Sequence, residues 1–180
     1  EYGIPIKKEE VRKLLASLVA KYLGKTVLWD VYLYQLKLIN LRVNIWGHVP
    51  FSPLKSTDNL PASWDESIVK QCVKGTVSDG EDFNALLNQC RIFIDINDEG
   101  KPTQTVLNAC ASGTFVMIKS HPDDNKPGGW GDYFDIGKEL ITFTTPEDML
   151  TKVNHYLKNG QERLQVATAA QQRCITDHNC

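Results

Sequence analysis

The stretch from Arg91 to Ile118 most constrains the fold, because it has the pattern of a strand, a helix and a second strand in close succession. The apolar segment Arg91–Ile96 leads through a polar loop into the small-residue segment Thr103–Ser112. A tight turn at Ser112-Gly113 precedes a second apolar segment, Thr114–Ile118. Two strands joined by a helix in this way normally lie parallel in one sheet. This unit therefore predicts an α/β fold.

The same alternation of apolar and amphipathic segments continues on both sides of this unit. Apolar residues spaced three and four apart indicate helices near both ends of the chain. Together these segments predict a Rossmann-like parallel sheet with helices on both faces. We expect further helices at Lys7–Leu23, Lys25–Leu41, Gly80–Gln89, Thr145–Leu157 and Gln161–Asp177, and further strands at Arg42–Trp46, within Ser67–Val77 and at Leu140–Phe143.

Short polar residues and one glycine mark the expected helix ends. The side-chain oxygen of Asp79 is expected to cap the helix that follows it, and Thr103 and Thr145 are expected to cap two later helices. Gly113 is expected in the left-handed conformation, where it ends the small-residue helix. These signals predict where the helices begin and end.

The length of 180 residues suits one domain of ordinary size. We expect residues 1–41 to form an N-terminal helical segment, with linker helices that pack on the domain, and residues 42–180 to form the Rossmann-like domain. The chain begins at Glu1 without a methionine and stops just after a predicted helix. These ends suggest a fragment of a longer protein.

Composition excludes several functional classes. The net charge of −2 and the pI near 6.1 lack the basic character of a nucleic-acid binder. The five cysteines are scattered without a CxxC pair, which argues against zinc and favours free thiols in a reducing, cytoplasmic compartment. No apolar run approaches the roughly 18 residues that span a membrane, and no signal peptide is visible.

The loop from Asp95 to Thr105 is the first candidate site. Ligands of open α/β sheets gather outside the carboxyl ends of the strands, and helix N-termini there favour anions. Asp95 and Asn97 lie at the end of a predicted strand and can bind sugar hydroxyls, although they equally suit a solvated turn. Thr103 and Thr105 can hold a phosphate at the helix N-terminus, although a plain capping role also explains Thr103.

Two other segments also have both a structural and a functional interpretation. Gly47 and His48 follow a predicted strand, where a glycine lets the backbone approach a phosphate, but a simple turn is the commoner explanation. Trp130, Tyr133 and Phe134 lie in a long glycine-rich loop. Such aromatic rings can stack on a sugar or base, and more commonly they fix a loop to the core. The dispersed histidines support no catalytic triad.

From Val43 onward the chain resembles the C-terminal half of a GT-B glycosyltransferase, most closely the spore-maturation CgeB-like group of the glycosyl transferases group 1 family. The resemblance covers roughly residues 42 to 178. Its clearest block is Leu-Asn-Ala-Cys-Ala-Ser-Gly-Thr-Phe-Val, which is similar to the family's Leu-Glu-Ala-Met-Ala-Cys-Gly-Thr-Pro-Val. The other blocks are Val43–His48, Gly75–Val77, Phe83–Asp95 and Gly131–Leu157, and the tail Gln161–His178 also fits.

This resemblance implies that the domain binds the nucleotide of a sugar donor, commonly without a metal or other cofactor. The acceptor would bind a missing N-terminal half upstream of Glu1. The full-length protein would then be a glycosyltransferase of the hexosyltransferase type, and the isolated piece would be inactive. No catalytic residue is assigned. The expected donor-binding residues are Gly47, His48, Asp95, Asn97, Thr103, Thr105 and Asn108.

Asn108 departs from the family pattern that the resemblance brings. Many retaining relatives place there a glutamate that holds the ribose hydroxyls, and pair it with a second glutamate eight positions earlier, where this chain has Gly100. Asparagine can both donate and accept a hydrogen bond, but it carries no charge. Two alternatives therefore stay open: a degenerate, non-catalytic domain that serves protein interaction, and an unrelated Rossmann-like ligand-binding module.

Overall fold

The computed structural model describes residues 32–33, 35–36, 41–46, 72–78, 80–96 and 100–178. The chain divides into two compact units, Glu1–Gly75 and Thr76–Cys180, and each is described by itself. The predicted helix Lys7–Leu23 lies outside the described residues, as do most of Lys25–Leu41 and the segment between the first two strands.

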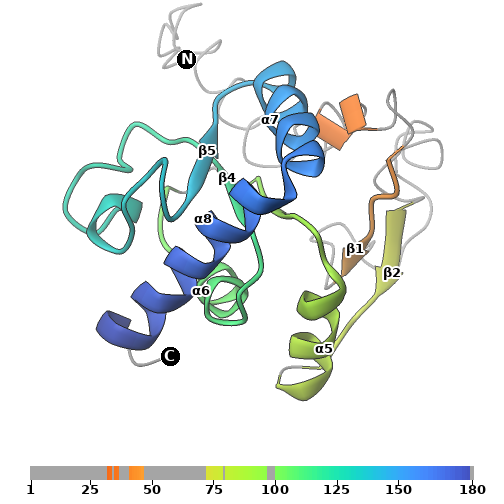
Figure 1. The fold of residues 1–180 in the computed structure, drawn as a ribbon, viewed down its shortest axis with the longest axis horizontal. Helices are drawn as coiled ribbons and strands as arrows, with labels where there is room; N and C mark the ends of the chain where they lie inside the picture. Colours follow the sequence, from red (N-terminus) through yellow and green to blue (C-terminus); the bar gives the residue numbers. More distant parts are fainter. Residues whose placement is uncertain are drawn as a thin grey trace, which may run out of the picture. The chain divides into compact units, whose positions relative to one another are not determined.

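The first unit contains a pair of short parallel strands (Figure 1). β1 (Ile45–Trp46) pairs with β2 (Val73–Gly75), and Ile45 lies opposite Val73. Both strands fall within predicted segments, which confirms the short strand expected between Ser67 and Val77. In the same unit the described helical residues Tyr32, Leu33 and Leu36 are buried, as is Cys72.

The second unit is built on a three-stranded parallel sheet in the order β3-β4-β5. A helix joins the first two strands, and a long loop with the 3-10 turn η2 (Trp130–Asp132) joins the last two. Because the strands are parallel, each connection returns to the same end of the sheet. The strands are β3 (Phe93–Asp95), β4 (Val116–Lys119) and β5 (Ile141–Phe143). The helices are α5 (Glu81–Gln89), α6 (Gln104–Ala111), α7 (Pro146–Lys158) and α8 (Gly160–Arg173), with one turn of π-helix at Cys174–His178.

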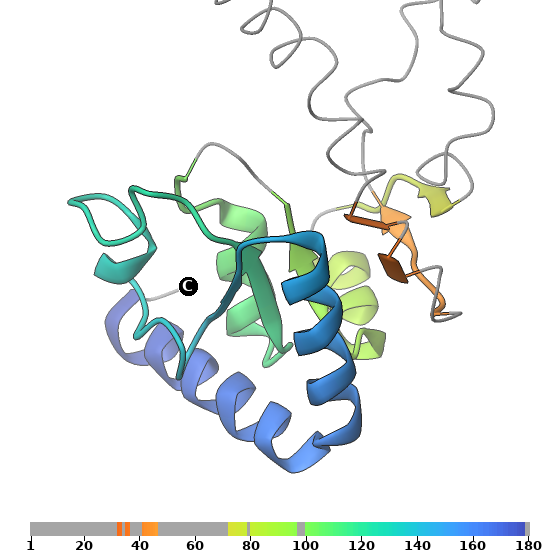
Figure 2. The ribbon, with the colours of Figure 1, turned by 90° about the horizontal axis from the view of Figure 1, so that it is seen from above.

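The central strand, β4, is buried on both faces. Val116 and Ile118 belong to a hydrophobic cluster with Val106 and Cys110 of α6. Met117 lies between them in the strand and points to the opposite face, where it is also fully buried. Figure 2 shows α6 on one side of the strands and α7 on the other. The predicted parallel sheet with helices on both faces is therefore confirmed.

Helix α8 packs against both α6 and α7 (Figure 1). Small residues, including Ala167 and Ala170, lie on its buried face. The Gln171 side-chain amide donates a hydrogen bond of 3.1 Å to the carbonyl oxygen of Ala111, the last residue of α6. Gly113 has a φ of 75°, as predicted for the residue that ends this helix.

One predicted helix cap is wrong. The N-cap of α5 is Gly80, with a φ of 87° and no side-chain hydrogen bond, and the predicted cap Asp79 lies outside the described residues. Glycine tolerates this positive φ. The helix therefore begins at Glu81, one residue later than predicted. The caps at Thr103 and Thr145 are confirmed, because their side chains accept hydrogen bonds from the N–H groups of Val106 and Asp148.

A matched pair of leucine substitutions tests the core around β4. Leu140 is 0% exposed within the cluster, and Leu164 on α8 is 64% exposed. We expect Leu140→Ala to lower the free energy of unfolding by about 2–5 kcal/mol, because it leaves a cavity in a packed core. Leu164→Ala should change it by less than about 0.5 kcal/mol. Urea denaturation followed by circular dichroism measures both, and equal effects would contradict this core.

Candidate functional site

Three chain segments leave the sheet of the second unit at one edge, which we call the carboxyl edge. The register places Asp95 of β3 opposite Ile118 of β4, and Ile118 opposite Thr142 of β5. Because the strands are parallel and aligned, the segments that follow them start side by side. Figure 2 shows the segment after β4 leaving at this edge. Ligands of open α/β sheets bind at such an edge.

The N-terminus of α6 opens onto the carboxyl edge. Thr103 has a φ of −111°, and its hydroxyl accepts a hydrogen bond of 3.4 Å from the Val106 N–H. The Thr103 carbonyl accepts the first helical bond, from the Leu107 N–H, at 3.1 Å. The N–H groups of Gln104 and Thr105 precede that bond and therefore have no acceptor within the helix. They and the exposed Thr105 side chain can meet an anionic ligand.

Asp95 and Asn108 are both half-buried, at the end of β3 and in the second turn of α6. The Asn108 side-chain oxygen accepts a hydrogen bond of 2.8 Å from the Gln104 side-chain amide. The backbone carbonyl of Asn108 also accepts hydrogen bonds from the Ser112 N–H and hydroxyl, at 3.0 Å and 2.8 Å. The uncharged side chain at 108 therefore already has a partner within the helix.

Three of the predicted donor-binding residues, Gly47, His48 and Asn97, lie outside the described residues. Their roles stay predictions. The described four come from two neighbouring places: Asp95 ends β3, while Thr103, Thr105 and Asn108 belong to the first half of α6 or its cap. Their donor-binding role also stays a prediction.

Ser120, His121 and Asp124 form a polar group after β4 that the sequence patterns did not predict. Asp124 is 4% exposed, and its Oδ2 accepts hydrogen bonds from the His121 N–H at 2.8 Å and the Ser120 hydroxyl at 3.3 Å. Its Oδ1 is buried and finds no hydrogen-bond partner among the described residues. A buried carboxylate oxygen without a partner is rare in native proteins. The only sequence signal was the position of Ser120-His121 directly after an apolar strand.

The His121 ring lies against Gly100, the described residue nearest the start of the segment that leads into α6. Gly100 is buried and has a φ of 61°. A Cβ atom at this position would lie 2.2 Å from Nδ1 of His121, far inside van der Waals contact. A side chain at position 100 and the observed ring therefore exclude each other. This contact joins the segments that follow β3 and β4.

The N-terminus of α7 is closed by its own side chains. The Asp148 N–H donates a hydrogen bond of 3.1 Å to the Thr145 hydroxyl. The Asp148 carboxylate accepts bonds from the Thr144 N–H and from Lys152 Nζ, both at 2.9 Å. Lys152 also donates a bond of 2.7 Å to the carbonyl of Thr142 in β5. This cluster is satisfied within the chain and fixes α7 to the sheet.

The aromatic loop packs into the core. Trp130 and Phe134 are buried in the cluster around β4, with their ring centroids 6.2 Å apart. Tyr133 is partly buried against the same cluster. The commoner of the two predicted outcomes, fixing of the loop to the core, is therefore confirmed for these rings.

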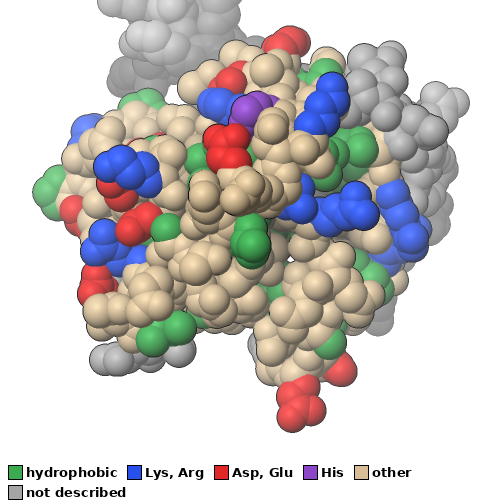
Figure 3. Space-filling view, viewed as in Figure 1, with side chains coloured by type: hydrophobic (Ala, Val, Ile, Leu, Met, Phe, Trp, Pro, Cys, Tyr) green, Lys and Arg blue, Asp and Glu red, His purple; other side chains and the backbone are tan. Residues whose placement is uncertain are grey.

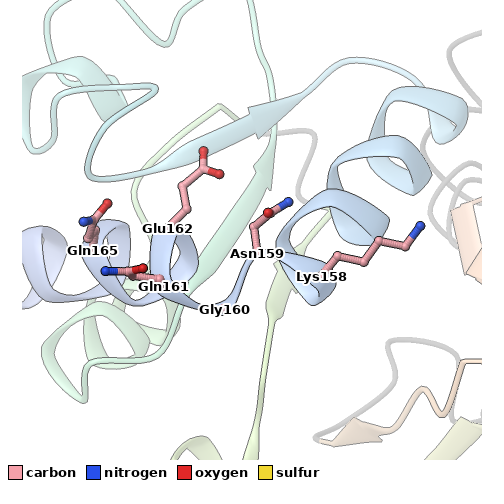
Figure 4. A pocket seen from close by; sticks show the side chains of 6 residues that line it. All are labelled: Lys158, Asn159, Gly160, Gln161, Glu162 and Gln165. Atoms are coloured by element: carbon pink, nitrogen blue, oxygen red, sulfur yellow. The ribbon is translucent and has the colours of Figure 1, made fainter.

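A hollow of about 500 Å³ lies elsewhere, at the turn between α7 and α8 (Figure 4). Helix α7 starts at the carboxyl edge and runs for 13 residues, so its last turn lies at the far end of the sheet. Nearby, Nε2 of His155 and Oε2 of Glu162 are 2.7 Å apart. The hollow is open and polar, and it lacks the apolar walls of an ordinary ligand pocket. Its lining residues are Lys158, Asn159, Gly160, Gln161, Glu162 and Gln165.

Charge and metal-ligand geometry add little to the choice of site. Figure 3 shows acidic and basic side chains mixed on the face that it displays. Within the described ranges, no group of three or more His, Cys, Asp or Glu side chains is arranged to hold a metal ion. No helix in the described part of the chain is long and apolar enough to cross a membrane.

The parallel sheet, its two helical layers and the open edge at α6 define a Rossmann-like α/β domain. Residues 31–180 match a family described as glycosyl transferase-like, and the match covers most of the chain. The chain belongs to this glycosyl transferase-like family. A comparison with curated proteins finds no match. The narrower resemblance to the CgeB-like group stays a prediction.

The Asp148 cluster predicts a pH-dependent contribution to stability. Burial opposes ionisation of Asp148, but hydrogen bonds from Lys152 and Thr144 outweigh it and hold its pKa below the ordinary value of 3.8. A depressed pKa in the folded state stabilises the fold above the ordinary value, and this contribution is lost as the pH falls through the folded pKa. We expect Asp148→Asn to cost about 1 kcal/mol at pH 7 and progressively less below pH 3.8.

Urea denaturation at a series of pH values measures this difference. The control is Glu147→Gln, which changes an exposed carboxylate in the same first turn. It should cost no more than about 0.5 kcal/mol, because the Glu147 carboxylate is paired with no described side chain and interacts mainly with the helix dipole. A pH-independent effect of Asp148→Asn would contradict the ion pair with Lys152.

Proposed function

We propose that this domain binds the nucleotide-sugar donor of a glycosyltransferase at the carboxyl edge of β3 and β4. The observation that carries the proposal is the match of residues 31–180 to the glycosyl transferase-like family. The proposed location is supported by the free N-terminus of α6 beside the polar segment that follows β4. Sugar transfer by the whole protein, with the acceptor held by a second half, is part of the proposal.

The N-terminus of α6 suits the diphosphate of such a donor. The N–H groups that have no acceptor within the helix, together with the helix dipole, favour negative charge, and Lys101 is exposed in the preceding loop. Charge accumulates on the departing nucleoside diphosphate during sugar transfer. Fixed N–H groups aimed at that charge stabilise the transition state without reorganisation. This chemistry needs no metal, in keeping with the expected absence of a cofactor.

The alternative is a non-catalytic domain that keeps the fold for protein interaction. Asn108 favours it, because this uncharged side chain is already paired with Gln104. Family membership itself argues against an unrelated Rossmann-like module. The scattered cysteines, without a CxxC pair, support a reducing, cytoplasmic compartment for the reaction.

A titration of the ¹⁵N-labelled chain with uridine and guanosine diphosphates tests donor binding. We expect one of them to bind with a Kd in the millimolar range or below, and to shift the amide signals of Gln104 and Thr105. Thermal shift provides a second measurement. No response to either nucleotide at millimolar concentration would favour the non-catalytic alternative.

Thr105→Glu tests whether the diphosphate lies at α6. A carboxylate near the phosphates should weaken nucleotide binding at least tenfold by repulsion. The same charge at a helix N-terminus favours the helix, so the fold should keep its stability. The matched control is Thr168→Glu, at an exposed position of α8, which should leave binding unchanged. Equal affinities of both variants would exclude this location.

A further inference from the structure

His121 is placed where a ligand at the carboxyl edge would be recognised. It follows β4, the middle strand of the sheet, and its ring lies against Gly100 in the segment before α6. Its side chain is 27% exposed, so part of the ring reaches the surface. The residue therefore contacts, just after the end of β4, the segment that leads from β3 into α6.

The surrounding contacts select one tautomer of the neutral ring. The Asp123 N–H donates a hydrogen bond of 3.1 Å to Nδ1 of His121. A nitrogen that accepts such a bond carries no proton, so the proton of the neutral imidazole lies on Nε2. Among the described residues, none is hydrogen-bonded to Nε2. The ring thus presents one hydrogen-bond donor that no other described residue uses.

The backbone beneath this ring is held firmly. The buried Asp124 carboxylate accepts the His121 N–H and the Ser120 hydroxyl, and the Asp124 carbonyl accepts the Gly131 N–H at 2.7 Å. Gly100, which has no side chain, leaves room for the His121 ring. A donor held in place before binding loses little freedom when a ligand arrives.

The charges around His121 indicate the class of group that it meets. Asp123 Oδ2 lies 3.6 Å from Nδ1, and the buried Asp124 carboxylate lies under the backbone. The negative charge of these carboxylates disfavours a phosphate beside His121. Lys126 pairs with Asp123 and offsets part of that charge. A neutral hydroxyl suits these surroundings better than a phosphate, because it can accept the hydrogen bond from Nε2–H and adds no negative charge.

We propose that Nε2–H of His121 donates a hydrogen bond to a hydroxyl of the sugar in the nucleotide-sugar donor. The inference rests on the proposed donor binding and extends it, since it separates sugar recognition at β4 from diphosphate binding at α6. His121 is then a specificity-determining residue. Gly100 is a positioning residue, because any side chain there displaces the ring.

The test compares two affinities in each variant: that for a nucleoside diphosphate and that for its sugar conjugate. UDP with UDP-glucose and UDP-N-acetylglucosamine, and GDP with GDP-mannose, are titrated into the ¹⁵N-labelled 180-residue chain. His121→Ala should weaken binding of the sugar conjugate about fivefold and leave the diphosphate unchanged, the effect of one neutral hydrogen bond. His121→Gln retains an N–H donor and should recover most of the loss.

Two further variants test whether the place of the His121 ring matters, and whether loss of a different histidine has the same effect. Gly100→Ala should reproduce the His121→Ala pattern while His121 is still present, because the ring must move. His155→Ala is the matched control, since this histidine lies on α7 and is paired with Glu162. It should alter neither affinity. Nitrogen NMR shifts of the His121 ring at pH 8.5 should show the proton on Nε2, and the opposite tautomer would overturn the proposal.

The outcomes distinguish this inference from the proposed function. Binding of the diphosphate with no change of the sugar preference in His121→Ala overturns the role of His121 and leaves donor binding intact. An equal loss for diphosphate and conjugate assigns His121 to the phosphates or nucleoside instead, and also overturns it. Binding of neither compound by the wild-type chain overturns both proposals.

Discussion

The second unit depends on β4, a short strand that must be covered on both of its faces. Val116 and Ile118 point into the cluster with α6, and Met117 points to the opposite face, where it is also fully buried. A strand with apolar side chains on both faces is stable only between two layers. Because both neighbouring strands run parallel to it, each connection must return across the sheet. The helical layers and the common carboxyl edge follow from this one constraint.

The same constraint brings the candidate site together. The segments after β3 and β4 leave the sheet side by side, and the contact of His121 with Gly100 joins them. The buried Asp124 carboxylate fixes the segment after β4, because it accepts a hydrogen bond from the His121 N–H. The site is thus a free helix N-terminus beside a fixed polar loop. The satisfied cluster of Asp148 and Lys152 at α7 serves stability instead.

Sequence patterns predicted the elements of the second unit well and its polar contacts less well. The strands and helices from β3 onward lie within a few residues of their predicted bounds, because apolar periodicity and caps such as Thr103 act locally. The predicted cap at α5 was wrong, because Gly80 at positive φ takes that position. His121 was passed over, because its partner Gly100 lies 21 positions earlier and carries no side chain to signal a contact.

The sequence by itself determined the α/β class, the parallel order of elements and the open helix end at Thr103, since each depends on residues close together in the chain. It also carried the resemblance to glycosyltransferases that the family match bears out. Tertiary structure alone decided that Trp130 and Phe134 belong to the core, that Asp124 is buried, and that His121 lies against Gly100. Those features arise from packing between segments far apart in the sequence, which no local pattern encodes.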